Sequence, residues 1–116
     1  MLTIAIIGCG AIGEAVARYL SDAEDIGIAA AIVREGRDAR ARELFGEDAA
    51  IVYGVDELAT AIDVVVDCAG HGALRQHGAK ALARGMDVVT VSSGALADAG
   101  LCERLAAAAQ EGGAQL

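Results

Sequence analysis

The sequence has no proline and no tryptophan, and aromatic residues make up only 3% of its 116 residues. Lysine and arginine together number nine against 17 aspartates and glutamates, so the formal net charge is −8. A chain with so few basic residues lacks the positive face that nucleic-acid binding requires. No apolar run reaches the roughly 18 residues of a membrane-spanning helix, and no basic segment precedes an apolar run as in a signal peptide. We therefore expect neither a nucleic acid nor a membrane among its partners.

Cysteine is also scarce: only Cys9, Cys68 and Cys102 occur, and they are widely spaced. No CxxC pair and no cysteine–histidine cluster with metal-ligand spacing is present, so we expect no metal site. An odd number of scattered cysteines is typical of free thiols in a reducing compartment, which predicts a cytoplasmic location. We expect all three to be small packing residues and assign none of them as a nucleophile.

Short apolar segments are abundant, because 55% of the residues are hydrophobic, and they alternate with helical patterns. Buried strands are predicted over residues 2–7, 28–33, 50–53, 63–67 and 87–91. Helices are predicted after position 13, over 39–45, in a short turn that Asp56 caps toward residue 61, and over 72–84 and 98–111. The core face of the first helix is assigned to Ile12, Val16, Tyr19 and Leu20. The predicted fold class is α/β, a Rossmann-type doubly wound parallel sheet of about five to six strands in the order 3-2-1-4-5(-6).

The end of the first predicted strand carries a G-x-G-x-x-G pattern that opens a helix. Gly8 permits the tight turn, Gly10 lets the backbone approach a pyrophosphate, and Gly13 allows close packing of helix on strand. The phosphates of a dinucleotide would lie at the positive N-terminal end of that helix. The cofactor-binding turn is therefore predicted to comprise Gly8, Cys9, Gly10, Ala11, Ile12 and Gly13.

The end of the second predicted strand selects between cofactors in such folds. The acidic position that would bind the adenosine ribose is not clearly filled, and Arg34 is the first polar residue there. Four arginines against two acidic residues between positions 34 and 42 make this stretch locally positive, which suits a 2′-phosphate. The alternative is a solvated helix face for Arg37, Arg40 and Arg42, which we favour for the last two. We predict that NADP is accepted and that NAD also binds.

Two further segments follow the carboxyl ends of later strands, where open α/β sheets bind ligands. Cys68, Ala69 and Gly70 are small enough to let a ribose and nicotinamide lie close to the backbone. His71 either hydrogen-bonds cofactor or substrate or caps its helix and faces solvent, whereas His77 is expected to be a half-buried or surface residue. Ser92 and Ser93 either hold the nicotinamide amide or a substrate carboxylate, or form a plain turn.

Three segments together resemble the L-aspartate dehydrogenase family: IGCGAIG at residues 7–13, DCAGH at 67–71 and VSSGAL at 91–96. That family oxidises L-aspartate with NAD(P)+ to iminoaspartate, which hydrolyses to oxaloacetate and ammonia. Its members have an N-terminal Rossmann domain and a C-terminal domain that carries the catalytic histidine and most substrate contacts.

The resemblance implies that residues 1–116 are the dinucleotide-binding domain and that the catalytic domain lies beyond Leu116, so no catalytic residue is assigned here. It also implies a dicarboxylic amino-acid substrate, a homo-oligomer at full length, and cofactor binding without turnover by this chain alone.

Two alternatives remain open. One is a relative of homoserine dehydrogenase or dihydrodipicolinate reductase, against which the segment Cys68–His71 argues. The other is a non-catalytic dinucleotide-sensing module that is complete at 116 residues. The missing sixth strand argues against such a module, because it leaves an open sheet edge. The same edge predicts that this chain self-associates.

Overall fold

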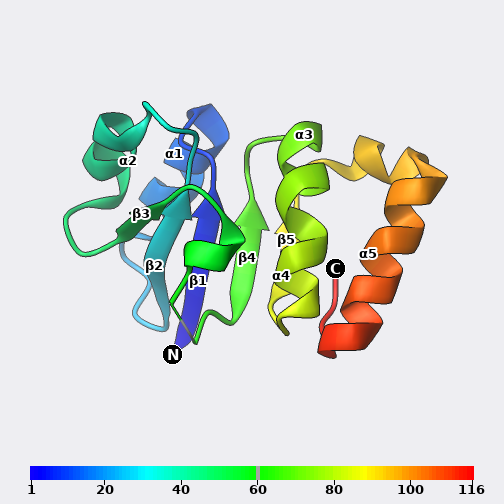
Figure 1. Ribbon diagram of the computed structural model, residues 1–116. Coiled ribbons are helices and arrows are strands. Elements are labelled where there is room, and N and C mark those ends of the chain that lie inside the picture. Colours follow the sequence, from blue (N-terminus) through cyan, green and yellow to red (C-terminus); the bar gives the residue numbers. More distant parts are fainter. Residues whose placement is uncertain (60) are drawn as a thin grey trace.

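The computed structural model describes residues 1–59 and 61–116, with His71 described by its backbone alone. Five parallel strands form one sheet in the order β3-β2-β1-β4-β5 (Figure 1). The strands are β1 (Leu2–Ile7), β2 (Ile26–Ile32), β3 (Ala50–Val52), β4 (Val64–Asp67) and β5 (Asp87–Thr90). The predicted Rossmann-type fold and strand order are confirmed.

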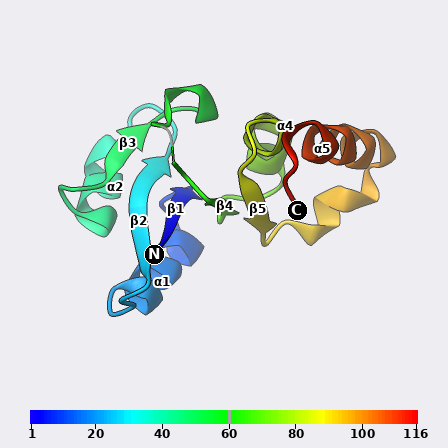
Figure 2. The same cartoon turned by 90° about the horizontal axis from the view of Figure 1, so that it is seen from below.

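Helices cover both faces of this sheet, as a doubly wound fold requires (Figure 2). On one face, α1 (Ala11–Leu20) and α2 (Asp38–Phe45) pack against the β1–β3 half. On the other face lie α3 (His71–Ala73), the π-helical turn η2 (Leu74–Gly78), α4 (Ala79–Ala83) and α5 (Ala99–Gly112). The short 3-10 turns η1 (Val55–Glu57) and η3 (Ser93–Ala97) follow β3 and β5.

The first strand illustrates why its sequence is apolar without alternation. Ala5 and Ile7 belong to the large core cluster that includes Leu74, Leu82 and other residues of the α4–α5 face. Ile4 and Ile6 belong to a separate cluster with Val16 and Leu20 of α1. Because both faces of β1 are buried, alternate positions have no reason to be polar.

Three details of the predicted helices differ in the structure. Ile12 is 47% and Tyr19 is 84% exposed, and the residues of α1 buried against the sheet are Gly13 and Ala17, because only small residues fit the close helix–strand contact. Asp56 lies inside the 3-10 turn η1 and does not cap it, since Gly54 precedes the turn. The expected continuation toward residue 61 crosses Thr60, which lies outside the described residues.

The third difference is that residues 72–84 do not form one regular α-helix. Five residues, Leu74–Gly78, form a π-helical turn between two short α-helical segments. Residues 93–97, expected as part of a loop, form a 3-10 turn before Asp98 caps α5 by accepting a hydrogen bond from the Leu101 N–H at 3.1 Å.

The segment after α5 returns to the outer edge of β5. Gly113 ends the helix in the left-handed region, with φ +68°. The Val88 N–H then donates to the Gln115 carbonyl at 2.8 Å, and the Gln115 N–H donates to Asp87 Oδ1 at 2.9 Å. Part of the β5 edge is therefore covered by this chain's own backbone. Within residues 1–59 and 61–116, no helix combines the length and apolarity needed to cross a bilayer.

Candidate functional site

A cavity of about 700 Å³ opens at the carboxyl ends of β1, β2 and β4. This is the place where the chain path reverses, because β1 pairs with β2 on one side and with β4 on the other. The lining comes from the turn after β1, the end of β2, Tyr53, the turn after β4 and the helical segment that follows. Its residues are Ile7–Ile12, Ile32–Arg34, Arg37, Tyr53, Cys68, Ala69, Gly72, Ala73, Gln76 and His77.

A different structural reason favours glycine at each of the three glycine positions of the first turn. Gly8 has φ +101°, and a Cβ there would lie 2.9 Å from the Cβ of Ala69. A Cβ at Gly13 would lie 2.9 Å from the Gly8 carbonyl oxygen. Gly10 differs, because its φ is −87° and a Cβ there would meet no protein atom within 4 Å. Gly10 lines the cavity, so the space that its missing side chain leaves is space for a ligand.

The helix that follows presents unpaired donors to the same space. α1 begins at Ala11, and its first regular hydrogen bond runs from the Glu14 N–H to the Gly10 carbonyl at 2.9 Å. The N–H groups of the first turn therefore have no helical acceptors. Such groups, together with the positive end of the helix dipole, attract an anion such as a phosphate. The turn fits the pyrophosphate of a dinucleotide.

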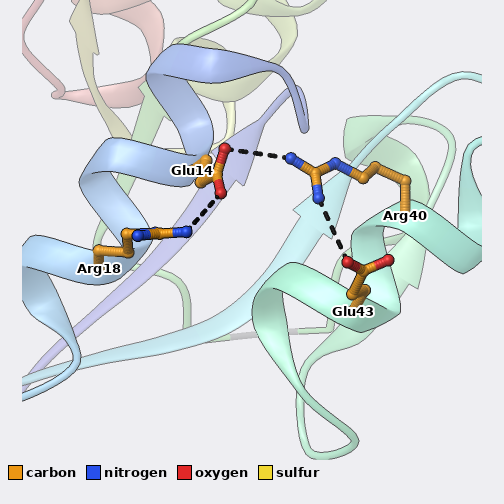
Figure 3. A network of polar contacts seen from close by, with 4 residues as sticks. All are labelled: Glu14, Arg18, Arg40 and Glu43. Carbon is orange, nitrogen blue, oxygen red and sulfur yellow. Dashed lines mark hydrogen bonds and ion pairs between the residues drawn. The ribbon is translucent and has the colours of Figure 1, made fainter.

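The positively charged stretch after β2 divides into two pairs of arginines. Arg40 contacts Glu14 of α1 at 3.2 Å and Glu43 at 3.6 Å (Figure 3). Arg42 donates to the carbonyls of Gly46, Glu47 and Ala49 at 2.7–3.0 Å. Both side chains thus contact other groups of the chain. The sequence analysis expected them only to face solvent. Arg34 and Arg37 are exposed and line the cavity.

Tyr53 is a cavity residue that the sequence analysis did not select. Its hydroxyl donates to Asp38 Oδ2 at 2.6 Å, and this hydrogen bond raises the pKa of the phenol. The contact joins the residue after β3 to the first turn of α2. Tyr53 therefore remains an uncharged wall of the cavity beside Arg34 and Arg37.

Asp67 organises the turn after β4, and sequence reasoning missed this role. The side chain is fully buried, with 0% exposure. Its Oδ1 accepts the N–H groups of Ala69 at 3.0 Å and Gly70 at 3.3 Å. Its Oδ2 accepts the hydroxyls of Thr90 at 2.8 Å and Ser92 at 3.1 Å. One carboxylate thus ties the turn after β4 to the end of β5.

The remaining predicted site residues fall into two groups. Cys68 and Ala69 line the cavity, and burial, together with the Asp67 charge, raises the pKa of the Cys68 thiol to about 11. Gly70 is in the left-handed region with φ +118°, and neither it nor Ser92 or Ser93 belongs to the described cavity lining.

Ser92 is only 2% exposed and its hydroxyl is directed to Asp67, while Ser93 begins η3. His71 begins α3, but its side chain lies outside the described residues, so neither interpretation of it is tested.

The sequence analysis predicts that His77 is half-buried or lies at the surface, and this prediction is wrong. It is 7% exposed, lies in the π-helical turn η2 and lines the cavity. Burial lowers the pKa of its imidazole, Lys80 lowers it further, and Asp67 partly opposes this. The sequence signal was weak, because an isolated histidine inside a helix does not reveal a π turn. No cluster of three or more metal-ligating side chains occurs in the described part of the chain.

Comparison with known sequences places these features in context. Residues 8–116 match the family described as homoserine dehydrogenase, NAD binding domain. The L-aspartate dehydrogenase of Ralstonia nicotianae is 41% identical over 119 aligned residues, which cover 100% of this chain and 44% of that protein. The L-aspartate dehydrogenase of Ruegeria pomeroyi is 43% identical over 113 residues, with 97% and 40% covered. The chain thus spans less than half the length of these curated relatives.

Among solved structures, aspartate dehydrogenase from Thermotoga maritima superposes with a TM-score of 0.68 at 24% identity. The alignment covers 99% of this chain and 44% of that one. At this level of identity the likeness concerns the fold, and it agrees with the five-stranded sheet described above.

Proposed function

The chain belongs to the family of homoserine dehydrogenase NAD-binding domains, and on this basis we propose that it forms the cofactor-binding part of an L-aspartate dehydrogenase. The observation that carries the proposal is the open space at Gly10, which no backbone strain or protein contact explains. The two relatives named above, both L-aspartate dehydrogenases, support the choice of substrate. The residues that would hold the cofactor are Gly8–Gly13, Arg34 and Cys68–His71. Ser92 and Ser93, which lie outside the described cavity lining, stay a prediction for the nicotinamide end of the site.

Each part of the cavity has a place in this proposal. The first-turn N–H groups of α1 bind the pyrophosphate, and Gly10 lets it approach. Arg34 takes the 2′-phosphate when the cofactor is NADP. Cys68 and Ala69 form the wall of small residues after β4. Asp67 acts behind this wall, because its hydrogen bonds to Ala69 and Gly70 fix the backbone there.

The reaction proposed for the whole enzyme is oxidation of L-aspartate, for which a bound nicotinamide would supply the acceptor of the hydride on the substrate Cα. This requires the two carbons to be held in near contact, which is mainly a positioning effect. Residues 1–116 supply the cofactor and one wall of that site. A second domain would supply the carboxylate-binding cations and the acid–base group, so this chain alone binds cofactor without turnover. We further propose that the complete enzyme is a cytoplasmic homo-oligomer.

The first experiment measures cofactor binding by calorimetry. Both NAD+ and NADP+ should bind, and Gly10→Val should abolish binding of both because its side chain fills the space of the pyrophosphate. Retained affinity in Gly10→Val, with an unchanged circular dichroism spectrum, would refute the phosphate placement.

Arg34 is tested with the same assay. Arg34→Ala should weaken NADP+ about 10- to 100-fold and leave NAD+ nearly unchanged, since a hydrogen bond to a charged group contributes about 1.5–3 kcal/mol. Arg18→Ala is the matched control, because that side chain is 79% exposed and pairs with Glu14 outside the cavity. Equal losses for both cofactors would remove the 2′-phosphate role.

The substrate is tested with a fusion of residues 1–116 to the remaining part of the Ralstonia nicotianae relative. We expect reduction of NAD(P)+ with L-aspartate and none with L-homoserine. Activity with L-homoserine would favour the alternative that the family description suggests. The unfused chain is the control and should bind cofactor without reducing it.

A further inference from the structure

We propose that His77, in the lining of the cavity, binds the adenine base of the dinucleotide by a hydrogen bond from its imidazole. This inference rests on the proposed cofactor binding and assigns a residue to its adenosine half. Three observations support it: the position of His77 in the cavity, the exposure of its ring nitrogens, and the chemistry that burial imposes on the ring.

The cavity extends from the pyrophosphate turn toward the adenosine side of the sheet. In this fold class the residue after β2 contacts the adenosine ribose or its 2′-phosphate, which places the adenosine beside Arg34. The same cavity is lined by Arg34 and Tyr53, by Gln76 and His77, and by the apolar residues Ile7 and Ile32. Ser92 and Ser93, at the end of β5, do not belong to its lining. His77 therefore lies in the half of the site that an adenine would enter.

His77 is almost fully buried and lines the cavity, since only 7% of the residue is exposed. Among the groups that the structure describes, which exclude the side chain of His71, no hydrogen bond to the His77 ring is found. Among the same groups, no side-chain nitrogen or oxygen is both fully enclosed and without a hydrogen-bond partner. The ring nitrogens thus keep access to the cavity that His77 lines. Buried polar groups normally have a hydrogen-bond partner, and a ligand in the cavity would supply one here.

The local backbone explains how this side chain reaches the cavity. The π-helical turn Leu74–Gly78 contains one extra residue per turn, and such turns frequently occur at functional sites. A Cβ at Gly78 would lie 2.9 Å from Leu74 Cδ1 and 3.0 Å from Leu105 Cδ2, so the turn packs tightly against α5. Leu74 and Gly78 therefore anchor the turn in the core while His77 faces the cavity.

The imidazole matches a purine better than a phosphate. Its burial favours the neutral form, which offers one N–H donor and one nitrogen acceptor. The edge of adenine offers the complementary pair, an amino donor and ring nitrogen acceptors. The anionic groups of the cofactor already have partners, in the amides of the first turn and in Arg34.

The test uses the fact that the chain has only two histidines. In imidazole ¹⁵N NMR spectra the His77 signals are identified as those missing from His77→Gln. Titration with AMP and with NAD+ should shift these signals, and titration with nicotinamide mononucleotide should leave them unchanged. A shift with nicotinamide mononucleotide alone, or no shift at saturating NAD+, would overturn the assignment.

Binding measurements give an independent readout. His77→Leu should weaken AMP about 2- to 10-fold, the range of one hydrogen bond, and His77→Gln should recover most of this loss. Wild type should prefer AMP to IMP, in which the amino group is replaced by a carbonyl, and His77→Leu should bind both alike. Arg18→Ala, whose side chain is 79% exposed and pairs with Glu14 outside the cavity, is the control and should behave as wild type.

Failure of this inference is distinguishable from failure of the proposed function. If NAD+ binds, Gly10→Val abolishes binding and the His77 signals do not move, the dinucleotide site stands and the adenine contact is wrong. If Gly10→Val binds as wild type does, the proposed function itself is wrong. The NMR titration is made on the wild-type chain and needs only His77→Gln for the assignment of the signals, so poor folding of His77→Leu leaves the test decisive.

Discussion

Replacement of Asp67 by alanine should destabilise this protein more than any surface substitution. The carboxylate accepts four hydrogen bonds at 2.8–3.3 Å while fully buried. In Asp67→Ala, water in the cavity can replace the acceptor at Ala69, which borders it. The hydroxyl of Ser92, only 2% exposed, has no such substitute, whereas Thr90 is only partly buried.

The magnitude follows from the Ser92 hydroxyl. A buried donor left without its acceptor costs about 1–3 kcal/mol, so Asp67→Ala should lower the free energy of unfolding by about 1–3 kcal/mol. Domains of this size have a total stability of about 5–15 kcal/mol, and about 4 °C of Tm corresponds to 1 kcal/mol, so the Tm should fall by roughly 4–12 °C. Asp67→Asn keeps one acceptor oxygen and adds an NH2 donor that a hydroxyl can accept, so its loss should be about half as large.

Urea unfolding followed by circular dichroism measures these losses. The matched control is Asp63→Ala, at the residue that directly precedes β4. The exposed carboxylate of Asp63 accepts a single hydrogen bond, from the Thr3 N–H at 2.8 Å. We expect Asp63→Ala to lose about 1 kcal/mol or less. If Asp67→Ala and Asp63→Ala prove equally stable, the buried network does not hold the two strand ends together and the reasoning fails. Cofactor affinity should fall with stability in Asp67→Ala, since the turn at Ala69 loses its support.

Three further predictions concern reactivity, pH and association. With its pKa raised to about 11, Cys68 should alkylate roughly 100-fold more slowly at pH 8 in the folded chain than in urea, and equal rates by mass spectrometry would contradict its burial. Because folding lowers the His77 pKa below its ordinary 6.5, stability should be full above pH 6.5 and decline as the pH falls below it. His77→Gln should flatten that decline in urea unfolding curves, and an unchanged slope would exclude His77 as its cause. The exposed apolar side chains of Val89, which is 56% exposed in β5, and of Val91, which is 52% exposed just after it, should drive self-association at high concentration. A monomer at all concentrations in ultracentrifugation would refute this, and Val89→Thr should weaken association.

Much of the site was predictable because its signals are local. Gly8, Gly10 and Gly13 lie within six residues, and the turn they form depends on backbone freedom and steric room at those positions. The first turn of α1 follows directly, so the glycine turn that lines the cavity could be predicted from the sequence. The position of Arg34 at the cavity could be predicted for the same reason, since it is the first polar residue after a strand that hydrophobicity alone defines.

The strand order and the glycine turn were thus determined by the sequence, because apolar runs and glycine spacing act over a few neighbouring residues. Only the tertiary structure decided the partners of Asp67, the burial of His77 and the choice of arginines at the cavity. Asp67 and Ser92 are 25 positions apart, and Arg40 and Glu14 are 26 apart. Contacts at such separations depend on how the folded strands and helices meet in space, which no local pattern encodes.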